Sequence, residues 1–171
     1  GDIDVLTVSQ TDGDLSYFEN DGSQVFAETI ISGTASSPVT VIAGDIDGDG
    51  DIDIVTGSQG DNQIVLHTND DFTNFTESVV ESSVMNPTSL GLGDFNGDGL
   101  MDITASAEAD ADLYVFTNDG DGTFSTITVG ALDAMEVFPA DVDGDGALDI
   151  LVASRAGNKV SWYENDGLAT P

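Results

Sequence analysis

The chain consists of short apolar runs separated by turn residues. The stretches SPVTVIAGD, DIDIVTGS, NQIVLHTND and NFTESVV are rich in β-branched or aromatic residues, and Gly, Asp and Asn divide them. This pattern is typical of strands in antiparallel sheets, and Asn-Asp-Gly between two runs favours a hairpin because these residues tolerate positive φ. No segment carries the apolar stripe of an amphipathic helix. The pattern predicts an all-β fold.

The strand pattern repeats along the chain together with an acidic stretch. GDIDGDGDIDI begins at Gly44, GDFNGDGLMDI at Gly93 and ADVDGDGALDI at Ala140, at spacings of 49 and 47 residues. A second landmark, an Asn at the end of an alternating run, keeps this register at Asn20, Asn69, Asn118 and Asn165. The repeat divides the chain into units covering residues 1–36, 37–86, 87–133 and 134–171.

The first and last units are incomplete. On the register of the repeat, the initial GDID matches the second half of an acidic loop, so we expect a segment of a longer protein. Four short strands per unit at this repeat length are typical of propeller blades. The sequence therefore predicts one β-propeller segment of about three and a half blades, each with four antiparallel strands.

The acidic stretches place oxygen-bearing side chains at alternate positions of a tight loop. Carboxylates held this close repel one another unless a cation lies among them. A hard ion such as Ca²⁺ takes roughly six to eight oxygen ligands, and glycines allow the loop to curl around it. We number each loop from its first Asp, so that side chains at positions 1, 3, 5 and 9 and the carbonyl at position 7 are the expected ligands.

Three complete loops fit this scheme, and we expect about three structural Ca²⁺ ions. The first loop supplies Asp45, Asp47, Asp49, Asp51 and Asp53; the second supplies Asp94, Asn96, Asp98, Leu100 and Asp102; the third supplies Asp141, Asp143, Asp145, Ala147 and Asp149. Asp51, Leu100 and Ala147 contribute the carbonyl. The incomplete loop at the start supplies only Asp4, at position 9. Solvated acidic turns are the simpler alternative.

The loops differ from an EF-hand and resemble another family. An EF-hand requires Glu at position 12 followed by a helix, but Thr56, Ala105 and Val152 stand there and strands follow. The pattern Asp-x-Asp/Asn-Gly-Asp-Gly-x-x-Asp at this spacing resembles the FG-GAP/VCBS repeats of integrin-α-like propellers, and WYENDG at 162–167 resembles the VCBS form. The resemblance implies a Ca²⁺-binding β-propeller with the loop between the first and second strands of each blade.

The charge of the chain limits its partners. Thirty-three acidic residues stand against two basic ones, which gives a net charge of -31. Nucleic acids and anionic membranes are therefore poor partners, because both bind through cationic side chains. Bound cations or a salty medium must offset the self-repulsion. Since millimolar calcium is found outside cells, we expect a secreted or cell-surface protein.

Few residues suggest catalysis. His67 is the only histidine, and Phe18, Phe116 and Tyr163 occupy its equivalent positions, so we interpret it as an ordinary strand residue. The aromatic residues of the same strands, Trp162 among them, favour packing between blades over a sugar-stacking surface. No nucleophile with an adjacent base is evident, and we expect no enzymatic activity.

The sequence favours a scaffold for adhesion, surface structure or ligand binding, with a protein or glycan as the partner. Three alternatives stay open: a carbohydrate-binding propeller, the propeller part of a secreted polysaccharide-active enzyme, and a subunit that self-associates through open blade edges.

Overall fold

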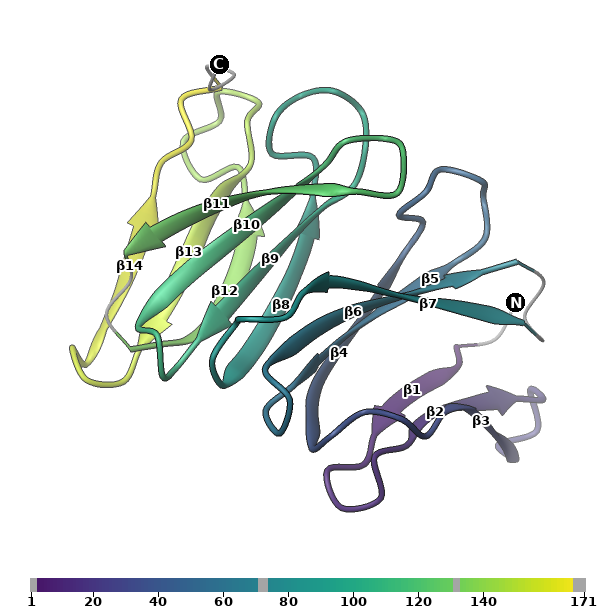
Figure 1. The fold of residues 1–171 in the computed structure, drawn as a ribbon. Coiled ribbons are helices and arrows are strands. Elements are labelled where there is room, and N and C mark those ends of the chain that lie inside the picture. The colour runs from purple at the N-terminus through teal and green to yellow at the C-terminus, as the bar shows by residue number, and fades with distance from the viewer. Residues whose placement is uncertain (1–2, 71–73, 131–132, 168–171) are drawn as a thin grey trace.

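A computed structural model describes residues 3–70, 74–130 and 133–167. Within these ranges the chain forms 14 strands in four antiparallel sheets and no helix, which confirms the all-β prediction (Figure 1). No helix that could span a membrane exists in these ranges.

Each sheet is a meander of strands that are consecutive in sequence. The first contains β1 (Val5–Val8), β2 (Leu15–Asn20) and β3 (Phe26–Ser32). The second contains β4 (Pro38–Gly44), β5 (Asp53–Ser58), β6 (Gln63–Asn69) and β7 (Phe75–Glu81). The third contains β8 (Pro87–Gly93), β9 (Asp102–Ala107), β10 (Asp112–Asn118) and β11 (Phe124–Gly130). The fourth contains β12 (Ala134–Ala140), β13 (Asp149–Ser154) and β14 (Lys159–Tyr163).

The sheets follow one another in a row, and the first strands of the second, third and fourth sheets lie next to each other. β4 contacts β1 on one side and β8 on the other, and β8 in turn contacts β12. In the part of the chain that the structure describes, the row is open, with β1–β3 at one end and β12–β14 at the other (Figure 1).

The core lies between the faces of neighbouring sheets. One cluster joins the second and third sheets through fully buried side chains such as Val55, Ile64, Ile103 and Phe116. Another joins the third and fourth sheets and includes Leu113, Val137 and Val152. The second strands β5 and β9 are buried along their whole length because a sheet packs on each of their faces. Each sheet therefore depends on its neighbours for its core.

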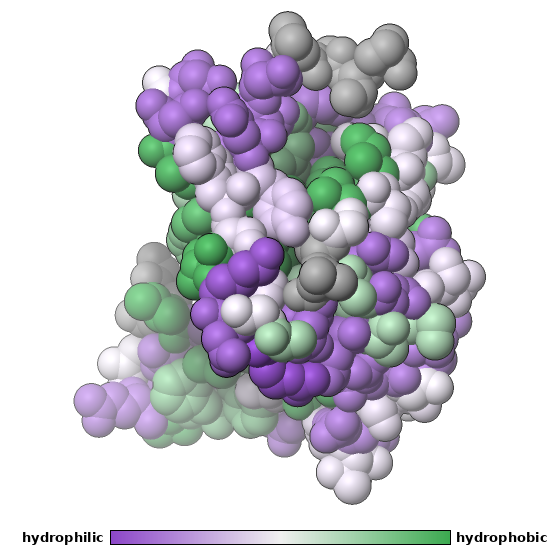
Figure 2. Space-filling view, turned by 90° about the vertical axis from the view of Figure 1, so that its left-hand side faces the viewer, coloured by the Kyte–Doolittle hydropathy of each residue, from purple (hydrophilic) through white to green (hydrophobic). Residues whose placement is uncertain are grey.

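The fourth sheet exposes several apolar side chains. They are Phe138, Val160 and Trp162, and Val142 is exposed in the loop that joins β12 to β13. The face of the molecule at this end carries both apolar and hydrophilic surface (Figure 2). This exposure follows from its position at the end of the row, where only one neighbouring sheet covers it.

Candidate metal centres

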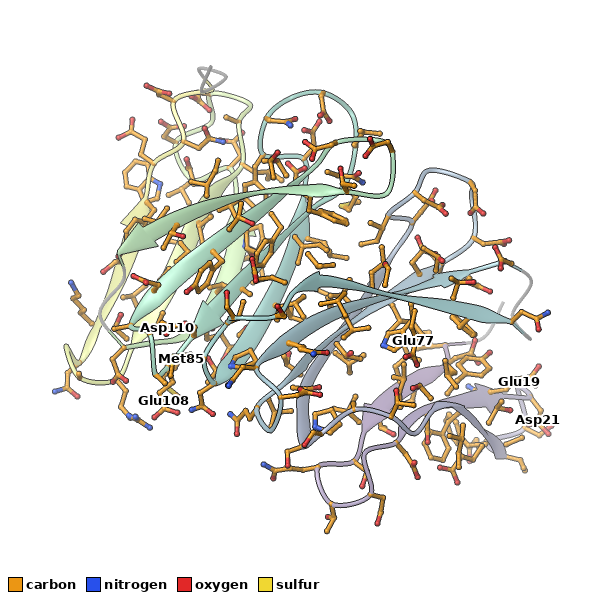
Figure 3. The ribbon with its side chains drawn as sticks, in the orientation of Figure 1. Glu19, Asp21, Glu77, Met85, Glu108 and Asp110 are labelled. Carbon is orange, nitrogen blue, oxygen red and sulfur yellow. The ribbon has the colours of Figure 1, made fainter. Side chains whose placement is uncertain are left out.

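The three acidic loops occupy equivalent places in the fold. Each connects the first strand of a sheet to the second: residues 45–52 join β4 to β5, 94–101 join β8 to β9, and 141–148 join β12 to β13. All three lie along the same edge of the row, at the top in Figure 1. Met85, Glu108 and Asp110 lie together at the opposite edge (Figure 3).

Side-chain to backbone hydrogen bonds shape each loop. The carboxylate at position 1 accepts a hydrogen bond from the N–H at position 4, as Asp45 Oδ1 does from Gly48 at 2.9 Å. Gly48 and Gly50 have φ values of 79° and 98°, in the left-handed region that glycine tolerates best. The same bond joins Asp94 to Gly97 and Asp141 to Gly144, both at 2.7 Å. The glycine spacing thus sets the curl that brings the alternate side chains together.

The predicted ligands converge in two of the loops. Among the described residues, two groups of three acids place carboxylate oxygens within 4.8 Å of one another: Asp45, Asp47 and Asp49 in the first loop, and Asp141, Asp143 and Asp149 in the third. In the second loop Asn96 replaces one acid, and its Nδ2 donates to Asp98 Oδ2 at 2.9 Å. An amide thus lies beside a carboxylate where the other loops have two carboxylates.

The aspartate at position 9 differs from the other predicted ligands because it is buried and anchored. Asp53, Asp102 and Asp149 are each 0% exposed. One oxygen of Asp102 accepts from Phe95 N and the other from Asn118 N, both at 2.8 Å. Asp53 and Asp149 accept the equivalent pairs of bonds. This residue therefore joins the start of the loop to the end of the third strand of the same sheet, besides offering lone pairs to the loop interior.

The residues predicted to contribute carbonyl oxygens lie half-buried where the loop turns toward the second strand. The N–H groups of Asp51, Leu100 and Ala147 donate to the carboxylates at position 5, at 2.9, 2.8 and 2.8 Å. Asp145 at position 5 lies outside the group of three acids in its loop, and its Oδ1 accepts the bond from Ala147.

The crowding of carboxylates changes their proton affinity. Partial loss of hydration, and to a smaller extent the charges of the other acids of the loop, raise the pKa of Asp47, against the hydrogen bond from Asp49 N that lowers it. Burial also raises the pKa of Asp102, against the two backbone hydrogen bonds that lower it. In the fourth sheet the hydrogen bond from Asn165 N instead lowers the pKa of Asp149. Bringing these acids together without a cation therefore has an electrostatic cost in the first and second loops.

The donor set fits a hard divalent cation. The loops offer only oxygen atoms, several of them exposed carboxylate oxygens on one side of a tight turn. Ca²⁺ prefers such ligands and accepts irregular geometry, whereas Mg²⁺ requires a near-ideal octahedron and retains its waters.

The asparagines of the second landmark have a role that the sequence did not reveal. Asn118 Nδ2 donates to Ile46 O of the preceding loop at 2.9 Å, and Asn165 Nδ2 donates to Phe95 O at 2.8 Å. The same Nδ2 atoms also contact Met101 O and Leu148 O in their own loops. These amides therefore connect neighbouring acidic loops. The equal spacing of Asp and Asn was the signal that they act together.

The incomplete first unit keeps part of this arrangement. Asn20 N donates to Asp4 Oδ1 at 2.8 Å, and Asn20 Nδ2 donates to Ile3 O at 3.1 Å. Asp4 thus takes the place that Asp53 takes in the next unit, as its register position predicts.

The aromatic residues and His67 occupy different environments. Phe116 is fully buried in the core, whereas Trp162 is 45% exposed in a groove of about 440 Å³ between the third and fourth sheets. His67 is only 3% exposed, and burial lowers its pKa, with a smaller opposing effect of Glu77. Packing between sheets therefore accounts for Phe116, and only in part for Trp162.

Fold and loops together define a protein built of repeated, loop-bearing antiparallel sheets. A family model described as "FG-GAP-like repeat" matches residues 1–56, 45–105 and 94–152. The chain therefore belongs to the FG-GAP-like repeat family.

A solved structure shares this fold. It is that of a lectin from Agrocybe aegerita, described as specifically recognising non-reducing terminal N-acetylglucosamine. The TM-score is 0.57 at 20% sequence identity, and the match covers 96% of this chain and 50% of the lectin chain. The chain thus spans about half the length of that protein. Among curated proteins, none matches this chain.

Proposed function

We propose that the chain is a calcium-stabilised segment of an extracellular β-propeller that acts as a non-enzymatic scaffold for adhesion, surface structure or ligand binding. Its blades comprise residues 1–36, 37–86, 87–133 and 134–171. Each complete loop holds one structural Ca²⁺ through the oxygens at positions 1, 3, 5, 7 and 9. The observation that carries the proposal is the convergence of carboxylates at equivalent loops along one edge.

The proposed role of the ion follows from the connections of the loop. A cation among the exposed acids of a loop also attracts the anchored Asp at position 9, which is bonded to the third strand of its sheet. Through the Asn amides, that attachment extends to the preceding loop. Binding of Ca²⁺ thus stabilises the contact between neighbouring sheets as well as one turn.

Thermal unfolding in Ca²⁺, Mg²⁺ and EDTA, combined with native mass spectrometry, tests the proposal. We expect a marked stabilisation specific to Ca²⁺ and about three bound ions, because three loops are complete. Asp49→Asn removes one charge from the first loop and should reduce the number of tightly bound ions by one. Asp21 is an exposed acid of a hairpin (Figure 3), and Asp21→Asn is the matched control. This substitution should leave the number of tightly bound ions unchanged. Identical unfolding in Ca²⁺ and EDTA would refute the calcium scaffold.

Carbohydrate binding is the second candidate function, and the Trp162 groove favours it. Phe95, Leu148 and Tyr163 line the groove together with the polar side chains of Asn96 and Glu164. An exposed indole face beside hydrogen-bonding groups suits stacking on a sugar ring. The lectin that shares the fold recognises N-acetylglucosamine, which makes this sugar the first probe.

The single Trp of the chain provides a direct readout. If the groove binds sugar, N-acetylglucosamine should change the fluorescence of Trp162 in a saturable way, and mannitol at equal concentration should not. An unchanged emission would exclude this groove as the sugar site and leave the calcium scaffold unaffected.

A further inference from the structure

A second, polar cavity of about 190 Å³ lies between the first and second sheets, away from the acidic loops. Strands β5, β6 and β7 form one side of it, and Thr34 and Ala35, which follow β3, form the other. This volume is well above the roughly 10–15 Å³ that one ordered water needs, so the cavity has room for a small ligand. Figure 3 shows Glu77, one of its lining residues, on β7 facing the first sheet.

The cavity contains buried polar atoms without hydrogen-bond partners. Among the described residues, four buried side-chain atoms lack a partner, and three of them belong to residues that line this cavity: Ser58 Oγ, Asp61 Oδ1 and His67 Nδ1. His67 is only 3% exposed to solvent. Its Nε2 forms a hydrogen bond with Thr56 Oγ1 at 3.1 Å. Since an unpartnered buried polar atom is costly, these atoms indicate a ligand or ordered water in the cavity.

Glu77 completes the polar lining. Its Oε1 lies 3.7 Å from His67 Nδ1, too far for a hydrogen bond but close enough for one group to contact both atoms. Ser32 at the end of β3 and Thr34 just after it hold the carboxylate from the other side by donating hydroxyl hydrogen bonds to it. Because the Glu77 side chain is 40% exposed, the cavity is accessible from solvent at this point.

Of this set of polar residues, His67 is found in the second unit alone, since the first unit has Thr7, Ser9, Asp12 and Glu28 at the other places and Phe18 in place of the histidine. In the third unit, 49 positions later, Thr56, Ser58, His67 and Glu77 correspond to Ala105, Ala107, Phe116 and Thr126. There the equivalent space is apolar core, with Ala105, Ala107 and Phe116 fully buried. The repeat does not require a polar cavity at this place, and His67 is the lining residue that the repeat leaves unexplained.

The chemistry of the lining selects the ligand. Asp61 and Glu77 give the cavity negative charge, and the two basic residues of the chain, Arg155 and Lys159, lie in the fourth unit. A metal ion is a poor fit, because neither group of three clustered ligands among the described residues includes His67. Acceptors exceed donors, so a cation with several N–H donors matches both the charge and the hydrogen bonds.

We propose that this cavity binds the ammonium group of a small free primary amine, with His67 Nδ1 and Glu77 as acceptors. In this arrangement the imidazole carries its hydrogen on Nε2 and donates it to Thr56 Oγ1, which leaves Nδ1 as an acceptor. A hydroxyl group offers one hydrogen and no charge, and therefore satisfies fewer of these atoms. The site is separate from the loops and from the Trp162 groove and does not depend on the proposed function.

The single histidine makes the test specific. The ¹⁵N imidazole signals of the full chain are recorded in Ca²⁺-containing buffer at pH 7.5 while n-propylamine is added. We expect a saturable shift of His67 Nδ1 in the Nε2–H tautomer. 1-Propanol, which has the same chain length, and tetramethylammonium, which has charge but no donor, should each bind at least tenfold more weakly.

Two matched variants separate this site from the general acidity of the chain. Glu77→Thr introduces the residue found at the equivalent place in the third unit and should weaken propylamine binding at least tenfold. Glu28→Thr removes the same charge from the equivalent strand position of the first unit and should leave binding unchanged. The proposal would be overturned if both variants weakened propylamine binding equally or if 1-propanol gave the same response. It would also be overturned if propylamine gave no saturable shift, and the cavity would then hold water.

Discussion

At the scale of single residues, similar aspartates have two different roles. Asp98 is exposed at position 5, where its oxygens contact the loop backbone and Asn96. Asp102 at position 9 is buried and accepts backbone hydrogen bonds from two separate segments. The first role is the proposed binding of a cation, whereas the second stabilises the fold with or without one.

Replacing each by Asn distinguishes the two roles. Asp102→Asn places an NH₂ group against a backbone N–H, and should lower the free energy of unfolding in EDTA by about 1–3 kcal/mol because one buried donor loses its acceptor. Asp98→Asn should change the free energy of unfolding in EDTA by less than about 0.5 kcal/mol, as is usual for exposed positions. Urea unfolding in EDTA measures both. Equal effects of the two substitutions would contradict the anchoring role of Asp102.

At the scale of elements, the repeat extends to the backbone of the tight turns. The turn between the second and third strands of a sheet has a residue at positive φ in three sheets: Asn62 at 59°, Ala111 at 58° and Asn158 at 46°. Asn tolerates this left-handed conformation, but Ala carries a steric penalty there of roughly 1–2 kcal/mol. The third sheet therefore has an unfavourable residue in a turn that is otherwise repeated.

Ala111→Asn should relieve this strain. Because Asn occupies the same turn in the sheets on either side, we expect a gain of about 0.5–1 kcal/mol in the free energy of unfolding. Ala111→Val, a β-branched residue at the same φ, is the opposing control and should destabilise the chain. Thermal unfolding of the two variants beside the parent chain gives the comparison, and a destabilised Asn variant would show that the turn does not limit stability.

At the scale of the whole molecule, charge is the dominant property. The net charge of -31 is distributed over a chain with two basic residues. Arg155 forms ion pairs with Glu108 and Asp133 between the third and fourth units, so it stabilises only one junction. Self-repulsion therefore opposes the packing of the sheets wherever cations do not offset it.

This repulsion predicts a strong dependence of stability on salt. In EDTA the melting temperature should rise by several degrees between about 0.1 and 1 M NaCl, as the screening length falls from about 10 to 3 Å. In saturating Ca²⁺ the rise should be smaller, because bound ions already neutralise the loops. Sucrose serves as the control for non-electrostatic effects. A melting temperature in EDTA that does not change with NaCl would contradict this account.

The sequence by itself determined the strands, the repeat and the acidic loops. These features depend on local chemistry: the period of apolar residues selects strands, and glycines between aspartates select a curled loop. The positions of Asp53, Asp102 and Asp149 in register with an Asn also followed from spacing alone. The family resemblance rested on the same residues and was confirmed.

Only the tertiary structure decided which side chains meet across sheets. It showed that Asn118 and Asn165 connect neighbouring loops, that Trp162 lies in an open groove, and that the first sheet covers His67 to leave a polar cavity. Spacing along the chain relates equivalent positions of different units to one another. Contacts between units depend instead on how the sheets pack, because residues far apart in sequence become neighbours only when the faces of two sheets meet.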